Sequence, residues 1–258
     1  MNSLLRARAV DVAIGSRRLV RGLDLELGRG QLLAVLGRNG AGKTTLLHAL
    51  AGLQAPAAGT LLLAGKPYAG DGHHSARAAA RLRGLLEQTQ SDSFPASVLE
   101  TALIGRHPHL GRWSWESASD KRIARAALDA VGLKGLEARD AASLSGGERQ
   151  RLAIATLLTQ QPGLYLLDEP LAHLDLAHQI AMLELWRRCA AEQQAAFVIV
   201  LHDANLALRY CQRSLLLFGD GRWREGRSEE VLSLAQLTEL YGHPLRQIEA
   251  AGERYFVA

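Results

Sequence analysis

Residues 32–53 have the sequence LLAVLGRNGAGKTTLLHALAGL, in which an apolar run leads into a glycine-rich loop and then into a second apolar pattern. The run Leu32 to Leu36 is continuously apolar, which is typical of a strand covered on both faces. Lys43 to Leu53 predicts a helix, because its leucines recur on one face. The order strand, glycine loop and helix therefore predicts a nucleotide-binding unit.

The glycine loop has the chemistry that a triphosphate requires. Its glycines let backbone N–H groups approach the phosphates, and the start of the following helix adds the positive end of its dipole. Lys43 can reach the outer phosphates, and Thr44 would supply its hydroxyl to Mg²⁺. The alternative is a glycine turn with a chance Lys-Thr pair, which the strand–loop–helix context disfavours. The predicted phosphate-binding residues are Gly37, Arg38, Asn39, Gly40, Ala41, Gly42, Lys43, Thr44 and Thr45.

Two further apolar strands end in polar residues. Leu164 to Leu167 is followed by Asp168 and Glu169, and Phe197 to Leu201 is followed by His202. Because parallel strands present ligands at their carboxyl ends, these side chains should meet the phosphate loop at one edge of a sheet. We predict that Asp168 holds Mg²⁺ and that two residues are catalytic: Glu169, which polarises the attacking water, and His202, which contacts the γ-phosphate. Surface decoration or a structural histidine is the alternative for each taken alone.

A third motif, LSGGERQ, occupies residues 144–150. Ser145 and Glu148 form a capping box, which an ordinary helix start would explain without any function. The paired glycines, Gly146 and Gly147, are not explained in this way, because they remove side chains where the helix amides emerge and a phosphate can approach. The loop at residues 37–44 already encloses a nucleotide from one side, so we expect this turn to serve a second subunit.

The remaining segments predict an α/β fold. Residues 7–27 alternate between apolar and polar, and with a strand at Gly59 to Ala64 they predict an antiparallel lobe. Residues 97–160 have helical patterns, and the clearest helices are expected at Asp120 to Val131 and at Gly147 to Gln160. The alternation of strand, helix and strand over residues 164–201 predicts a parallel sheet.

Composition narrows the class of protein. At 258 residues and 48% apolar content the chain can bury one substantial core. No run approaches the roughly 18 apolar residues of a membrane span, and the start lacks a secretory signal, so we expect a cytosolic chain that does not cross a bilayer. The net charge of +4 is weak support for an anionic partner, and because the arginines are dispersed we expect no nucleic acid. Cys189 and Cys211 are expected to be reduced thiols.

Taken in order, these motifs carry a resemblance to a known family. GRNGAGKTT, Gln88, LSGGERQ, LYLLDEP, Leu174-Asp175 and His202 follow one another as in the nucleotide-binding subunit of ATP-binding cassette (ABC) transporters, which the chain resembles over essentially its whole length. The resemblance implies a single ABC ATPase domain, residues 1–258, with the P-loop NTPase fold. A RecA-like parallel-sheet core with the antiparallel β lobe would span 1–88 and 161–258, and an inserted α-helical subdomain, 89–160, would carry LSGGERQ.

The resemblance also implies a paired ATPase that uses ATP and Mg²⁺. In the family two cassettes enclose two ATP molecules head to tail, so the serine–glycine turn of one copy would cap the triphosphate that Lys43 of the other copy holds. Gln88, at a predicted strand end, would touch Mg²⁺ and couple the site to a transmembrane partner, with Gln90 as the rival for that role. The nucleotide-binding residues that the family adds are Ser145, Gly146, Gly147 and Asp175.

A finer resemblance points to importers of iron–siderophore complexes, haem or cobalamin. It depends on Phe94 to Val98 with Ile104 to Pro108, on Leu174 to Gln179, and on the tail from Val231 to Gly242. It implies integral membrane permease subunits, an extracytoplasmic substrate-binding protein and a peripheral place on the cytoplasmic face of the inner membrane. The alternative is a soluble ABC ATPase of the iron–sulfur assembly type.

The sequence departs from the family pattern at two places. Where the family stacks an aromatic residue on adenine, this chain has Ile14, so base recognition is expected to differ. Where the family carries a serine after the Asp-Glu-Pro segment, this chain has Leu171-Ala172-His173, so an interface hydroxyl is missing.

Overall fold

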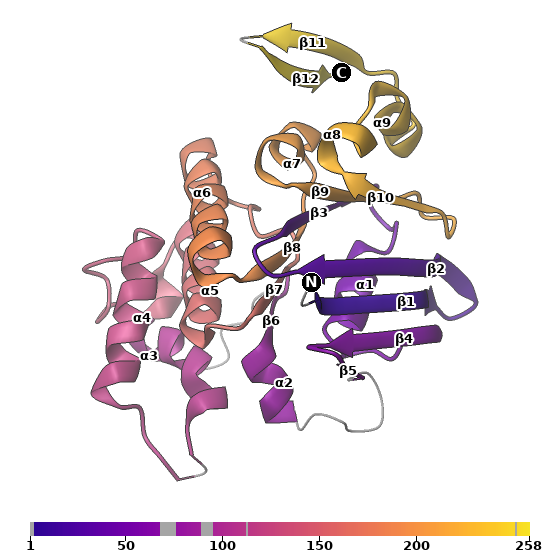
Figure 1. Ribbon diagram of the computed structural model, residues 1–258. Helices are drawn as coiled ribbons and strands as arrows, with labels where there is room; N and C mark the ends of the chain where they lie inside the picture. The colour runs from indigo at the N-terminus through magenta and orange to yellow at the C-terminus, as the bar shows by residue number, and fades with distance from the viewer. Residues whose placement is uncertain (1–2, 68–75, 89–94, 112, 251) are drawn as a thin grey trace.

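The computed structural model describes residues 3–67, 76–88, 95–111, 113–250 and 252–258. Gln90, the rival magnesium ligand, and Phe94, the first residue of the importer motif, lie outside these ranges. Within them, a central sheet is covered by helices on one side and by an antiparallel sheet with one helix on the other (Figure 1). In the described part of the chain, no helix combines the length and the apolar character of a membrane span.

The central sheet has six strands in the order β10-β9-β3-β8-β7-β6. All neighbours are parallel except β10, which runs antiparallel to β9. This order confirms the predicted parallel-sheet core. In chain order the strands are β3 (Leu32–Gly37), β6 (Arg83–Leu86), β7 (Leu164–Leu167), β8 (Ala196–Val200), β9 (Arg213–Leu217) and β10 (Trp223–Arg227).

The predicted antiparallel lobe is a second sheet, of order β2-β1-β4-β5. The segment around Gly59 joins it as expected, since β4 pairs antiparallel with β1. A two-stranded hairpin, β11-β12, lies near the C-terminus (Figure 1). The strands are β1 (Ser3–Ile14), β2 (Arg17–Gly28), β4 (Ala58–Leu63), β5 (Lys66–Pro67), β11 (Arg246–Ala250) and β12 (Glu253–Val257).

The two faces of the central sheet bury two separate apolar cores. Along β3, Leu33 and Val35 pack toward the antiparallel lobe, whereas Leu32, Ala34 and Leu36 pack toward the larger group of helices. Successive side chains on a strand point to opposite faces, so a strand that is apolar at every position can serve both cores. This is why the run 32–36 is continuously apolar.

The helices surround these sheets, and short 3₁₀ segments, η1 and η2, connect some of them. The helix α1 lies between the antiparallel lobe and the central sheet, and α3, α4 and α5 pack together at one side (Figure 1). The elements are α1 (Lys43–Leu50), α2 (Ala76–Leu82), α3 (Val98–Leu103), η1 (Ile104–His109), α4 (Ala118–Ala130), η2 (Ala141–Ser143), α5 (Gly146–Gln160), α6 (Leu176–Gln193), α7 (Ala204–Tyr210), α8 (Ser228–Val231) and α9 (Leu234–Tyr241).

The helix prediction for Lys43 to Leu53 was too long. The helix ends at Leu50, because Gly52 adopts φ = 68° and the Leu53 N–H donates back to the His48 carbonyl at 3.0 Å. This bond, with that of the Gly52 N–H to Ala49, is a Schellman motif, which terminates a helix. Leu53 is therefore 60% exposed and does not continue the apolar face.

Of the helical pattern predicted for residues 97–160, the two clearest segments are confirmed as α4 and α5, and turns interrupt the stretches around them. Pro108 lies inside the 3₁₀ segment η1, and Gly132 and Gly135 have positive φ angles beyond α4. Proline lacks the N–H that a longer helix needs, and glycines in the left-handed region end one.

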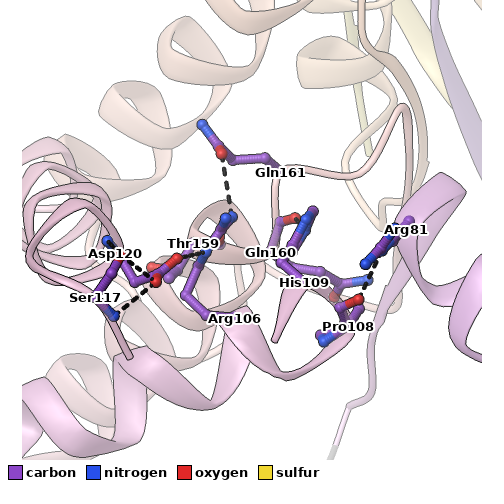
Figure 2. Close-up of polar contacts among 9 residues, drawn as sticks. All are labelled: Arg81, Arg106, Pro108, His109, Ser117, Asp120, Thr159, Gln160 and Gln161. Atoms are coloured by element: carbon purple, nitrogen blue, oxygen red, sulfur yellow. Dashed lines mark hydrogen bonds and ion pairs between the residues drawn. The ribbon is translucent and has the colours of Figure 1, made fainter. Parts of the chain in front are cut away.

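A buried polar network ties the helical region together (Figure 2). Arg106 and Asp120 are each only 8% exposed, and the Arg106 Nε lies 2.8 Å from the Asp120 Oδ1. The Arg106 Nη1 also donates to the Thr159 carbonyl at 3.1 Å and to the Gln161 Oε1 at 3.2 Å. One guanidinium thus links η1, α4 and the end of α5.

Candidate functional site

The carboxyl ends of three neighbouring parallel strands hold the predicted chemical groups. The phosphate loop follows β3, Asp168 and Glu169 follow β7, and His202 follows β8 after Leu201. The strand was expected to run to Leu201, and it ends one residue earlier at Val200. Because β3, β8 and β7 are adjacent in the sheet, these groups share one edge, as sequence reasoning predicted.

The phosphate loop needs glycine at its helix start. Gly42 caps α1 with φ = 100°, and a Cβ built there would lie 2.8 Å from the Leu19 Cβ. Gly37 is equally confined, because its Cβ would lie 2.7 Å from the Leu217 carbonyl oxygen. The loop therefore runs close to its neighbours with its backbone amides unobstructed by side chains.

Lys43 is buried beneath this loop. Its Nζ donates to the Gly37 carbonyl at 2.9 Å and to the Arg38 carbonyl at 3.3 Å. Burial lowers the pKa of Lys43, and the nearby charges of Glu169 and Asp168 partly oppose that change. The ammonium thus lies among the loop carbonyls, close to the two carboxylates.

Asp168 is an unpaired buried carboxylate. It is 2% exposed, and neither side-chain oxygen has a hydrogen-bond partner in the structure. Burial raises the pKa of Asp168, and the nearby Thr44 hydroxyl partly offsets this change. The hydroxyl does so without forming a hydrogen bond of normal geometry to either carboxylate oxygen. The Asp168 N–H donates to the Leu86 carbonyl at 2.9 Å, which fixes the backbone against β6. A buried carboxylate with no partner is costly, and a cation would supply one.

The residues predicted as metal ligands have the oxygen donors that a hard cation such as Mg²⁺ prefers. Among the described residues no group of three or more His, Cys, Asp and Glu side chains is arranged to hold a metal. Thr44, Gln88 and Asp168 offer a hydroxyl, an amide and a carboxylate, all of them oxygen donors. Mg²⁺ prefers oxygen donors and is usually held by one or two carboxylates together with phosphate oxygens and water.

Two side chains, Gln88 and His202, hold Glu169. Its Oε1 lies 2.8 Å from the His202 Nε2, and its Oε2 accepts a hydrogen bond from the Gln88 Nε2 at 2.9 Å. Glu169 has φ = 48°, a left-handed conformation that is strained for a residue with a side chain. Gln88, Glu169 and His202 therefore converge: Glu169 and His202 were predicted to share this edge, whereas the contact between Gln88 and Glu169 was not predicted.

The serine–glycine turn lies apart from the phosphate loop. Ser145 caps α5: its Oγ accepts from the Glu148 N–H at 3.3 Å, and its own N–H donates to the Glu148 Oε2 at 2.8 Å. Ser145 and Gly146 are exposed. Among the described residues no hydrogen bond or ion pair joins residues 145–147 to residues 37–45.

Two residues near this turn have local roles that the sequence did not reveal. A Cβ on Gly147 would lie 3.1 Å from the His173 carbonyl oxygen, so packing within the chain favours glycine there, whereas Gly146 faces open space. Asp175 caps α6, accepting from the His178 N–H at 2.9 Å, and its Oδ1 lies 2.9 Å from the His178 Nδ1.

The structure adds a residue that sequence reasoning missed. The Tyr241 Oη donates to the His202 carbonyl at 3.1 Å, although 39 residues separate the two in the chain.

Ile14 stands where the family has an aromatic residue, and its side chain is 61% exposed at the end of β1, opposite Arg17. The Arg17 Nη2 donates to the Gly219 carbonyl at 3.1 Å.

Comparison with known proteins tests the resemblance. The family model described as ABC transporter matches residues 20–172. The chain belongs to the ABC transporter family. As a member of this ABC family, it is an ATPase coupled to transport, and the predicted P-loop NTPase fold is confirmed.

Relatives and a solved structure agree with this assignment. A hemin import ATP-binding protein of Burkholderia lata, HmuV, is 37% identical over 264 residues, which cover 95% of this chain and 96% of the relative. A cobalamin import ATP-binding protein of Halobacterium salinarum, BtuD, is 41% identical over 231 residues, 89% of this chain; the chain spans 56% of that relative's length. A metal-chelate type ABC transporter solved in an inward-facing conformation has a TM-score of 0.84 at 30% identity, over 99% of this chain and 96% of that one.

Proposed function

We propose that this chain is the ATP-hydrolysing subunit of an ABC importer and that two copies bind two Mg²⁺–ATP molecules head to tail. One observation carries the proposal. The phosphate loop, Asp168, Glu169 and His202 share one edge, while the exposed turn at Ser145 makes no hydrogen bond or ion pair to that edge among the residues that the structure describes. The site of one copy is incomplete in this respect, and a second copy can complete it.

The proposed roles follow from the contacts. Lys43, which now donates to two loop carbonyls, would turn its ammonium to the outer phosphate oxygens. Thr44, Gln88 and Asp168 would hold Mg²⁺, and the orphaned oxygens of Asp168 support this role. When bound, the ion supplies charge stabilisation on the phosphate oxygens.

Glu169 would orient and deprotonate the attacking water. Gln88 and His202 each contact one of its oxygens, so its carboxylate plane is fixed before substrate binds. Fixed geometry of this kind lowers the barrier, because no reorganisation is needed during reaction. His202 would also reach the γ-phosphate.

The facing copy would supply Ser145, Gly146 and Gly147 to the γ-phosphate, with Asp175 beside them. Binding of ATP would close the pair, and hydrolysis with phosphate release would reopen it. We keep the division into a core (1–88 and 161–258) and a helical subdomain (89–160) as part of this proposal, because the turn at Ser145 would then move as a unit with its helices.

The cargo that we propose is a metal chelate: an iron–siderophore complex, haem or cobalamin. The names of the hemin and cobalamin import relatives support it, as does the likeness to the metal-chelate type transporter. Permease subunits in the inner membrane would bind this chain at the cytoplasmic face, and an extracytoplasmic binding protein would deliver the chelate. A soluble assembly factor is the alternative; failure to sediment with membranes or to co-purify with a polytopic protein would favour it.

A mixing experiment tests the shared site. Lys43→Ala and Ser145→Ala should each lose ATPase activity as pure proteins. In mixed pairs one of the two sites regains both an intact lysine and an intact serine. Half of the pairs are mixed at equal concentrations, so activity should recover to about a quarter of the wild-type value. No recovery at any mixing ratio would contradict sharing.

The matched control is Ser97→Ala. Ser97 caps α3 through the same capping box, with the Glu100 N–H donating to its Oγ at 3.3 Å. Its loss removes a cap worth about 1 kcal/mol but no proposed phosphate contact. This variant should therefore keep its ATPase activity.

Cargo requires its own measurement. The subunit would be reconstituted in vesicles with its co-purified permease, and ATPase activity would be followed as binding protein loaded with haem, cobalamin or an iron–siderophore complex is added. Stimulation by one chelate identifies the cargo. Equal rates with loaded and empty binding protein would contradict chelate import.

A further inference from the structure

The segment that carries His202 is held by the C-terminal part of the chain. His202 follows β8, and its side chain is 54% exposed, so its own packing restrains it little. Its backbone carbonyl accepts a hydrogen bond from the Tyr241 Oη at 3.1 Å. Tyr241 is the last residue of α9, and burial raises the pKa of its phenol to about 12, so the hydroxyl stays a donor at every physiological pH.

The same segment is held a second time three residues later. The Asn205 Nδ2 donates to the Phe256 carbonyl at 3.1 Å, and the Phe256 N–H donates to the Asn205 Oδ1 at 2.8 Å. This reciprocal pair attaches α7 to β12. Phe256 is itself only 6% exposed, which fixes the strand against the core.

The anchor of Tyr241 is rigid and lies near the phosphate loop. Leu237 and Leu240 of α9 are buried at 0% and 2% exposure, so the helix cannot shift without opening the core. At its end, Gly242 adopts φ = 66°, and a Cβ built there would lie 3.3 Å from the Arg38 Nη1. The corner formed by Tyr241 and Gly242 thus contacts the His202 segment and lies close to a phosphate-loop side chain.

We propose that Tyr241 is a positioning residue for ATP hydrolysis, which acts by holding the His202 backbone so that the imidazole meets Glu169. The Nε2–Oε1 distance of 2.8 Å depends on where the end of β8 places His202, and the Tyr241 hydroxyl donates a hydrogen bond to the carbonyl of that residue. The inference rests on the proposed function, since it assumes that His202 acts in the reaction.

The test is Tyr241→Phe, which removes the hydroxyl and keeps the half-buried ring. We expect kcat to fall about 10-fold to 100-fold, since a displacement of about 1 Å has effects of this size, while KM for ATP stays within about twofold. The matched control is Tyr255→Phe in the same C-terminal region, whose hydroxyl donates to the Glu253 Oε2 at 2.7 Å rather than to the His202 segment. That variant should keep the wild-type kcat.

A double-mutant cycle separates positioning from general stabilisation. If Tyr241 acts through His202, then Tyr241→Phe should have no further effect on kcat in a His202→Ala background. An undiminished effect in that background, or a wild-type kcat for Tyr241→Phe, would overturn the inference while leaving the proposed role of His202 intact. Full turnover by His202→Ala alone would instead refute that role, and the inference with it.

Discussion

Two buried aspartates in this molecule are in opposite states. Asp120 accepts from the Arg106 Nε at 2.8 Å, and from the Ser117 N–H and Oγ at 2.9 and 2.6 Å. The Ser117 hydrogen bonds, with that of Arg106, lower the pKa of Asp120 to about 2. Among the described residues, no hydrogen bond reaches either oxygen of Asp168, and burial raises its pKa.

This difference between the two aspartates distinguishes a structural carboxylate from one that is available to a ligand. A paired and hydrogen-bonded carboxylate such as Asp120 stabilises the helices that it joins. A buried carboxylate such as Asp168 costs stability in the isolated chain and is tolerated where a ligand supplies the missing partner. We therefore expect the two aspartates to respond in opposite ways to the same substitutions.

The largest expected effect is that of Asp168→Asn on hydrolysis. Loss of the carboxylate removes the proposed magnesium ligand, and a metal contributes several kcal/mol of charge stabilisation, so Mg²⁺-dependent ATPase activity should fall about 10³-fold or more. The free energy of unfolding without Mg²⁺ should not decrease. The matched variant Asp120→Asn should show the reverse: reduced stability, and unchanged turnover per folded molecule. Equal turnover by Asp168→Asn and the wild type would refute the metal role.

The second-largest effect is expected when the buried ion pair between Arg106 and Asp120 is broken. Arg106→Ala leaves Asp120 buried without its guanidinium partner, which is expected to destabilise the protein by about 3–5 kcal/mol. Urea denaturation measures this loss. The double variant Arg106→Met with Asp120→Leu should recover most of it, since replacing a whole buried pair by apolar side chains is often neutral. If the single and double variants were equally unstable, volume rather than charge would explain the result.

These contacts also mark what could be predicted from the sequence. The residues from Gly37 to Thr45, with Asp168, Glu169 and His202, were located correctly because each follows an apolar strand and parallel strands end at one edge. The family resemblance gave Gln88 as a magnesium ligand, but its hydrogen bond to Glu169 was not predicted. Their roles in binding and catalysis stay predictions.

Contacts between distant segments were not predictable. Nothing in the local pattern around Tyr241 indicates that its hydroxyl meets His202, and Arg106 is one arginine among many until packing buries it. Likewise, Gly147 looked like a phosphate contact alone, whereas its approach to the His173 carbonyl depends on how α5 packs beside that loop. Local periodicity does not encode such contacts.

A smaller effect is expected in the pH dependence of stability, which should differ between Asp120 and Asp168. The folded pKa of Asp120 lies below its ordinary value of 3.8, so its contribution is present above pH 3.8 and is lost as the pH falls toward 2. The folded pKa of Asp168 is raised, so the Mg²⁺-free protein loses stability as the pH rises above 3.8 through that pKa. Urea unfolding of the wild type and Asp168→Asn should therefore diverge in favour of the variant with rising pH. A constant difference at all pH values would contradict an ionised, unpaired Asp168.

The smallest expected effect concerns backbone strain, which both regions contain. Glu169 has φ = 48°, and Gln161, which accepts from Arg106, has φ = 52°. Glycine relieves such strain, which costs about 1–3 kcal/mol. Glu169→Gly should raise the free energy of unfolding by about 1 kcal/mol while abolishing hydrolysis, because its contacts to Gln88 and His202 are partly exposed and contribute little to stability.

Gln161→Gly should change the free energy of unfolding by less than about 1 kcal/mol, because the relief of strain is offset by the lost hydrogen bond to the buried Arg106 guanidinium. Urea denaturation of both variants measures this difference. A loss of stability in Glu169→Gly would contradict the prediction, because it would show that the Glu169 side chain stabilises the fold by more than its strained backbone costs.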